Sequence, residues 1–169
     1  LLTNGDGLST IALTTIPADI SAVGTVLRIE DYLGTDGTDS GWNFGSVSGT
    51  GVTGIDLDGL QDDFTVVTGC SFTSMSGPAI SIANSAAVSY LFGGTTVCGA
   101  ANPNQVNRGV VLTNNDALAT FEFASLSIDA ILDGFTADAG VIDFSGTAPT
   151  IFVEEQHALS LANCVSTSG

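Results

Sequence analysis

Apolar and polar residues alternate along this chain in short runs that are separated by glycine and small polar residues. The clearest unit extends from Gly77 to Gly99, with apolar runs at residues 79–82, 88–92 and 95–97. Alternation with a period of two is typical of β-strands, and the Asn-Ser and Gly-Gly pairs between the runs are typical of turns. The unit therefore predicts three short strands joined by tight turns.

The same pattern repeats from residue 54 onward. In each repeat a glycine is followed by an apolar strand, a polar turn and two further strands, and residues 100–105 and 129–138 are predicted to be insertions between strands. The opening glycines are Gly54, Gly77, Gly109 and Gly140. Alternation predicts that the following residues point inward: Ile55, Leu57, Ile80, Ile82, Val110, Leu112, Ile142 and Phe144.

A single three-strand turn cannot bury its inward side chains, whereas stacked turns pair their backbones and align apolar residues into columns. Helical periodicity is almost absent. The pattern therefore predicts an all-β solenoid over residues 24–169, with three strands per coil and about four to five coils. Residues 1–23, in which residues 11–16 alternate like an edge strand, are predicted to be an N-terminal lead-in or cap. An antiparallel β-sandwich or jelly roll is the alternative.

The phrases GCSFTSMSGPAISI (residues 69–82) and NCVSTSG (residues 163–169) resemble the coil sequences of right-handed parallel β-helix proteins from tailed phages. That group includes tailspikes, tail and head fibres, and proteins of the capsid surface. The resemblance covers about residues 54–169 and implies a trimeric structural protein at the virion surface, outside the cell and in contact with other virion proteins. Because the chain has only about four clear coils, we expect capsid decoration or a fibre or tail attachment.

The charge balance restricts the possible partners. The 169 residues include 18 acidic and 2 basic side chains, which gives a net charge of −16. A chain of this charge repels nucleic acid and anionic lipid, so neither is an expected partner, and no apolar run is long enough for a membrane span. Only 12% of the residues are charged, about half the usual share. We therefore expect copies of the chain or other proteins to cover part of its surface.

Carboxylates are the main candidates for chemistry, because polysaccharide hydrolysis uses a pair of them. The candidates are Asp56, Asp58, Asp62 and Asp63, with Glu154 and Glu155 in a second turn. Asp56 and Asp58 alternate with apolar residues, so both should point outward, about 7 Å apart. Solvated surface acids are the favoured interpretation, which predicts a protein without enzymatic activity. A glycan-binding or glycan-cleaving tailspike fragment is the main alternative, with Trp42 and Tyr90 as candidate groove aromatics. A bacterial surface adhesin or filament subunit is a third possibility.

The remaining reactive residues give weaker patterns. Asp36 and Asp39, like Asp56 and Asp58, have a spacing that would suit calcium, but the ordered ligands of a known calcium loop are missing. Neither a metal nor a cofactor is therefore expected. His157 is interpreted as an exposed rim residue. Arg28 and Arg108 lie outside acidic clusters in the sequence, which argues against lyase chemistry. The three cysteines, Cys70, Cys98 and Cys164, are interpreted as small buried apolar residues.

Overall fold

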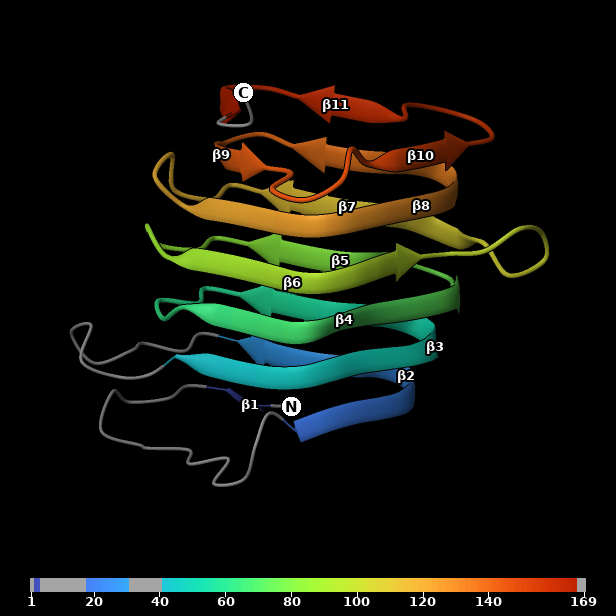
Figure 1. The fold of residues 1–169 in the computed structure, drawn as a ribbon, viewed down its shortest axis with the longest axis horizontal. Helices are drawn as coiled ribbons and strands as arrows, with labels where there is room; N and C mark the ends of the chain where they lie inside the picture. Colours follow the sequence, from blue (N-terminus) through green and yellow to red (C-terminus); the bar gives the residue numbers. More distant parts are fainter. Residues whose placement is uncertain (1, 4–17, 31–40, 167–169) are drawn as a thin grey trace.

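The computed structural model of the chain describes residues 2–3, 18–30 and 41–166, and all of its regular elements are β-strands (Figure 1). The strands are β1 Leu2–Thr3, β2 Ala18–Glu30, β3 Trp42–Asp58, β4 Phe64–Met75, β5 Pro78–Ala83, β6 Ser89–Cys98, β7 Val106–Thr113, β8 Thr120–Ala137, β9 Gly140–Asp143, β10 Thr150–Val153, β11 Leu159–Leu161 and β12 Cys164–Ser166.

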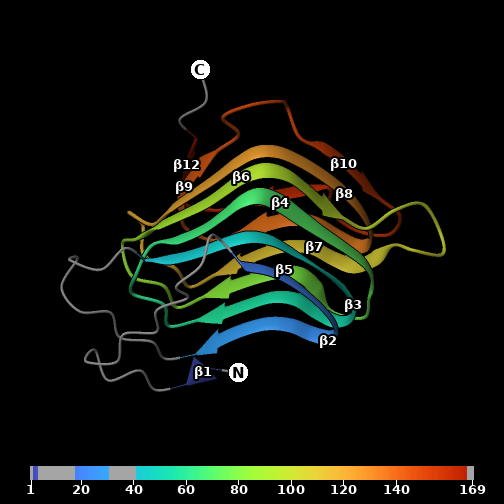
Figure 2. The same cartoon turned by 60° about the horizontal axis from the view of Figure 1, so that its bottom comes forward.

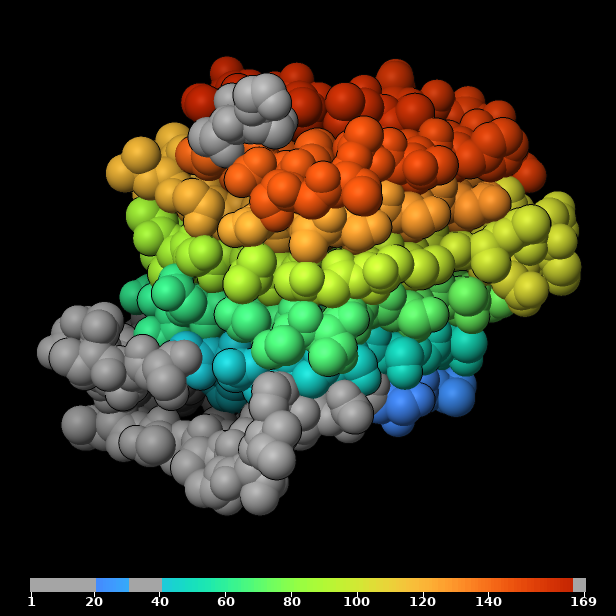
Figure 3. Space-filling model, viewed as in Figure 1, coloured from blue at the N-terminus to red at the C-terminus, as the bar shows by residue number. Residues whose placement is uncertain are grey.

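The strands stack coil upon coil into a parallel β-solenoid of about five turns. Each pairing between the described strands is parallel, and the paired residues lie one coil apart in the sequence. Long strands such as β3 therefore pair with the next strand along the chain, whereas β4 pairs with β6 and β5 with β7. In Figure 3 the coils form successive bands that follow the order of the sequence. The predicted solenoid is confirmed, and the antiparallel sandwich is excluded because its hairpins would need antiparallel pairs.

Each coil has three sheet faces. The first sheet contains the ladder Phe44, Val66, Phe92 and Phe123, the second contains Val47, Cys70, Thr96 and Leu126, and the third contains Leu27, Ile55, Ile80, Val110 and Phe135. Strands β3, β4, β6 and β8 each run along the first sheet and bend into the second, as Figure 2 shows. A shift in register at the bend keeps the side chains of both sheets pointing inward, as Phe44 and Val47 do in β3, so all three faces enclose one core.

Glycine permits the bend between the first and second sheets in β4 and β6. Gly69 has φ +121°, and a Cβ atom there would lie 2.2 Å from the Thr95 carbonyl oxygen. A Cβ atom at Gly94 would lie 2.0 Å from the Thr68 carbonyl oxygen. These close backbone approaches explain why the Gly93-Gly94 pair, predicted to be a turn, instead lies inside the continuous strand β6 with a shift in register.

The predicted alignment of opening glycines is correct for three coils and wrong for the fourth. Ile55 pairs with Ile80, and Ile80 pairs with Val110, as expected. Val110, however, pairs with Phe135, whereas Val141 lies in the first sheet opposite Thr120. Residues 129–138 are therefore not an insertion but the end of β8, because Phe135 and Ala137 supply inward side chains there. The insertion predicted at residues 100–105 is confirmed as the connection between β6 and β7.

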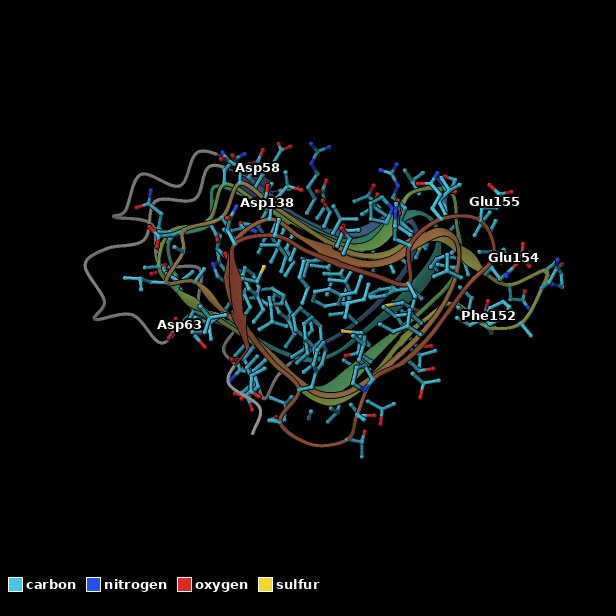
Figure 4. The ribbon with its side chains drawn as sticks, turned by 90° about the horizontal axis from the view of Figure 1, so that it is seen from above. Asp58, Asp63, Asp138, Phe152, Glu154 and Glu155 are labelled. Carbon is cyan, nitrogen blue, oxygen red and sulfur yellow. The ribbon has the colours of Figure 1, made fainter. Side chains whose placement is uncertain are left out.

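Aromatic rings form columns in the core. Phe92 and Phe123 are stacked with centroids 4.7 Å apart, and Tyr90 and Phe121 are stacked at 4.9 Å. The inward residues predicted from alternation are confirmed as buried, except that Phe144 in the last coil is only partly buried. Figure 4, which looks along the stack, shows side chains filling the interior of the coils.

The N-terminal expectation falls mostly outside the described residues, including the strand expected at residues 11–16. Within the described part, β2 begins at Ala18 and continues through Gly24 while paired with β3. Residues 18–23 therefore pair with β3 in the same way as the rest of β2.

Loss of the Phe123 ring should destabilise the stack strongly. Phe123 is fully buried and contacts the rings of Phe92, Phe135 and Phe144, so Phe123→Ala should lower the free energy of unfolding by about 3–5 kcal/mol. The control, Leu118→Ala, removes a side chain that is 72% exposed and should change it by less than about 0.5 kcal/mol. Urea unfolding measures both, and equal losses would contradict the column of rings as a source of stability.

Candidate functional site

A polar corner follows the third sheet in successive coils. Here the backbone takes a left-handed conformation at Gly59, Asn84, Asn114 and Asn163, with φ between 53° and 73°. Asparagine adopts this conformation more readily than other residues with a side chain. We call this set, with Asp58 and Asp138, the asparagine corner.

Side chains of the asparagine corner bond from one coil to the next. Asn84 donates Nδ2–H to Asp58 Oδ1 at 2.6 Å, and Asn114 donates Nδ2–H to Asn84 Oδ1 at 2.6 Å. The Asn114 backbone N–H donates to both carboxylate oxygens of Asp138, at 2.8 and 2.9 Å. Figure 4 shows Asp58 and Asp138 at the same corner of the stack. Asp58, a candidate catalytic residue, is therefore part of a structural ladder.

Asp56 points outward from the third sheet beside a basic residue. Arg28 lies one coil below, with its Nε 3.3 Å from Asp56 Oδ2, and it also pairs with Glu30. Burial raises the pKa of the Asp56 carboxyl, Arg28 opposes that rise, and the nearby carboxylates of Glu30 and Asp58 add to it. The sequence-based view that Arg28 stands apart from acidic residues is wrong, because it pairs with Asp56 on the next coil and with Glu30 on its own strand.

The second arginine also contacts a carboxylate on the next coil. Asp133 is largely buried, and its two oxygens lie 3.4 Å from Arg108 Nε and 3.5 Å from His157 Nδ1. His157 is mostly exposed, as predicted, and its carbonyl accepts the Gly134 backbone N–H at 2.9 Å. Asp133 thus connects residues of three coils, and alternation alone gave no signal for this contact.

The other candidate acids also bond between coils. Asp63 Oδ1 accepts the Ser89 backbone N–H at 2.8 Å. The buried Gln105 donates from Nε2 to Asp129 Oδ1 and to Glu154 Oε1, each at 2.9 Å. Asp62 is buried, whereas Glu155 is exposed. In Figure 4, Asp63 lies apart from Asp58, and Glu154 and Glu155 lie at the far end of the coil. The structure therefore does not bring the two sets of candidate acids together.

The proposed groove aromatics are in the core. Trp42 is 7% exposed at the start of β3, and Tyr90 is fully buried against Phe121. Burial raises the pKa of the Tyr90 hydroxyl well above its usual value. The prediction that these two residues line an outer groove is wrong, since both follow the inward parity of the first sheet.

The part of the chain that the structure describes includes all three cysteines and some of the candidate metal ligands. That part holds no group of three or more His, Cys, Asp or Glu side chains placed to bind a metal ion. Asp36 and Asp39 lie outside it. Cys70 and Cys98 are buried as predicted, and burial raises the pKa of the Cys70 thiol to about 12. Cys164 is partly exposed, which differs from the prediction.

No family model matches the chain, and neither a curated protein nor a solved structure shows significant similarity to it. Within the described ranges, no helix is long and apolar enough to cross a membrane.

Two substitutions at Asn84 separate its hydrogen bonds from its backbone conformation. Asn84→Gly keeps the left-handed backbone but removes two side-chain bonds, so it should lower the free energy of unfolding by about 1 kcal/mol. Asn84→Ala also strains the backbone and should cost about 1 kcal/mol more. Urea unfolding tests the order, and an alanine variant as stable as the glycine variant would contradict it.

Asp56 should give the protein a measurable pH dependence. Its folded-state pKa is raised above 3.8, so the folded state holds the proton more tightly than the unfolded state does. Stability from this group is present below pH 3.8 and is lost as the pH rises through the raised pKa. The side chain of Asp56→Asn does not titrate and so does not lose stability in this way. The free energy of unfolding of the variant should therefore rise relative to that of the wild type between pH 3 and pH 7. Urea midpoints at both pH values test this, and a constant difference would refute it.

Proposed function

We propose that this chain is a self-associating structural protein of a tailed-phage virion, exposed on the particle as a capsid decoration or as a fibre or tail attachment. The parallel β-solenoid supports this proposal, because it is the fold that the resemblance to phage β-helix proteins implied. The proposal includes contacts with other virion proteins and assembly into a homotrimer.

The observation that carries the proposal is the use of acidic side chains between coils. These residues accept hydrogen bonds from another coil or pair with a basic side chain there: Asp56, Asp58, Asp63, Asp129, Asp133, Asp138 and Glu154. A glycoside hydrolase typically needs two carboxylates that converge on the scissile bond. Carboxylates distributed along the stack instead stabilise the stack itself, which suits a structural part.

The surface of the described residues also favours association. Large apolar side chains are exposed at several positions: Val23, Val52, Val67, Leu118, Phe152, Leu159, Leu161 and Val165. With only 12% charged residues in the chain, burial against other copies would replace a charged coat.

Light scattering after size-exclusion chromatography tests the homotrimer. We expect a particle whose mass corresponds to a multiple of three chains of 17.0 kDa. A well-behaved monomer at micromolar concentration would count against self-association.

Mass spectrometry of purified particles tests the location. The chain should be present in virions of the phage that encodes it, in many copies, and it should be accessible to antibody on intact particles. A bacterial adhesin or filament subunit would instead be found on cells. Absence of this chain from complete virions would refute the proposal.

Glycan cleavage is the second candidate function. Asp56 and Asp58 alternate outward on β3, and the raised pKa of Asp56 favours the protonated form that a general acid needs. Because Asp56 is paired with Arg28 and Asp58 accepts a hydrogen bond from Asn84, we expect no release of reducing ends from capsule or lipopolysaccharide. Turnover that disappears in both Asp56→Asn and Asp58→Asn would establish the enzyme instead.

A further inference from the structure

The outward side of the second sheet carries hydroxyl groups on several coils. Inward side chains of this sheet, such as Val47 and Cys70, are buried, so the residues that alternate with them point outward. We call this outward surface the hydroxyl face. It comprises the outward side chains of residues 46–50, 69–73, 95–97 and 125–129. Its hydroxyl groups occupy equivalent positions on different coils, with Ser48, Ser71 and Ser127 in one row and Thr50 and Thr73 in another.

Charge is nearly absent from the hydroxyl face but is present on the other two sheets. Asp129, at the edge of the face, is the one charged side chain within these described ranges, and it accepts a hydrogen bond from Gln105. On the first sheet, the outward residues Glu122 and Asp143 are register partners. The third sheet carries the outward charged residues Arg28, Glu30, Asp56 and Asp58. The acidic residues of the coils therefore lie mostly away from the hydroxyl face.

Exposed valines border the hydroxyl face on both sides. Val67 is 44% exposed at the bend from the first sheet into the second, and Val52 is 53% exposed where β3 bends from the second sheet into the third. Val23 is 85% exposed and pairs with Thr50, on the same side of the face as Val52. Exposed apolar side chains together with a scarcity of charge are typical of the centre of protein–protein contacts.

The net charge of the chain favours a second copy as the occupant of this face. Each copy carries a charge of −16. Two copies that met through their first or third sheets would place like charges at short range. The hydroxyl face avoids this repulsion. A basic partner would instead be attracted to the acidic residues of the other two sheets.

We propose that copies of the chain associate through the hydroxyl face. This inference deepens the proposed self-association and rests on it. In the homotrimer the three hydroxyl faces are turned toward the three-fold axis, so that the edge with Val67 of one copy meets the edge with Val52 of the next. Such a contact is heterologous and closes after three copies, and the acidic sheets stay in solvent.

The test compares two double variants that have the same change in charge. Ser71→Asp/Ser127→Asp places two carboxylates on the hydroxyl face, two coils apart. Ser81→Asp/Thr136→Asp places two on the outward side of the third sheet at the same spacing. In light scattering after size-exclusion chromatography, the first variant should have a three-fold lower mass than the wild type, that of one 17.0 kDa chain. The second should keep the wild-type mass. Circular dichroism establishes that both variants are folded.

Hydroxyl-radical footprinting of the wild type provides a second measurement that needs no variant. Oxidation of Val23 and Val67 should fall at least two-fold as the concentration rises into the range of the assembly, because both side chains become covered. Leu118, which is 72% exposed in the turn before β8, should be oxidised equally at all concentrations.

The outcomes separate this inference from the proposed function. A trimer whose mass is unchanged in Ser71→Asp/Ser127→Asp would overturn the hydroxyl face as the contact and leave the trimer intact. Equal loss of mass in both double variants would also overturn it, because added charge on either sheet would then be sufficient. A wild-type monomer would refute the self-association and this inference with it. Protection of Val23 and Val67 in intact virions would then identify a different virion protein as the occupant.

Discussion

Parallel pairing of each strand with the strand one coil away is the constraint on which the rest of this structure depends. It places every side chain about 4.8 Å from the side chain at the same position of the neighbouring coils. Rings therefore stack on rings, as Phe92 does on Phe123, and amides bond to amides, as Asn114 does to Asn84. Alternation alone gives each strand one apolar face and one polar face. The apolar faces are shielded from water only because the three sheets close around one interior.

The same constraint determines how an acidic chain can form a stack. Like charges at equivalent positions of adjacent coils would repel one another at short range. The carboxylates instead accept hydrogen bonds from other coils: from Asn84 for Asp58, from Gln105 for Asp129 one coil away and Glu154 two coils away, and from a backbone N–H for Asp63 and Asp138. Both arginines are used similarly, against Asp56 and Asp133. The polar residues thus select the stacking register while the apolar residues supply the burial.

A stack of this kind is nearly one-dimensional, so its ends differ physically from its middle. Inner coils bury their inward side chains completely, whereas Leu159 and Leu161 occupy the same register and stay exposed.

The sequence by itself determined the period-two alternation, the inward residues such as Ile80 and Val110, and the loop at residues 100–105, because these depend on neighbours close along the chain. The pattern also aligned Ile55, Ile80 and Val110 between three coils, but the tertiary structure decided the alignment of the last coils and the polar contacts between coils. Gln105 and Glu154 are 49 residues apart, and Val110 lies over Phe135 rather than over Val141. Because the loops between strands differ in length, the local pattern of apolar residues does not predict this pairing register. For the same reason the pairing of Arg28 with Asp56 has no local signal. Trp42 and Tyr90 lie in the core because they share the inward parity of Phe44 and Phe92, which became clear only once the first sheet was placed.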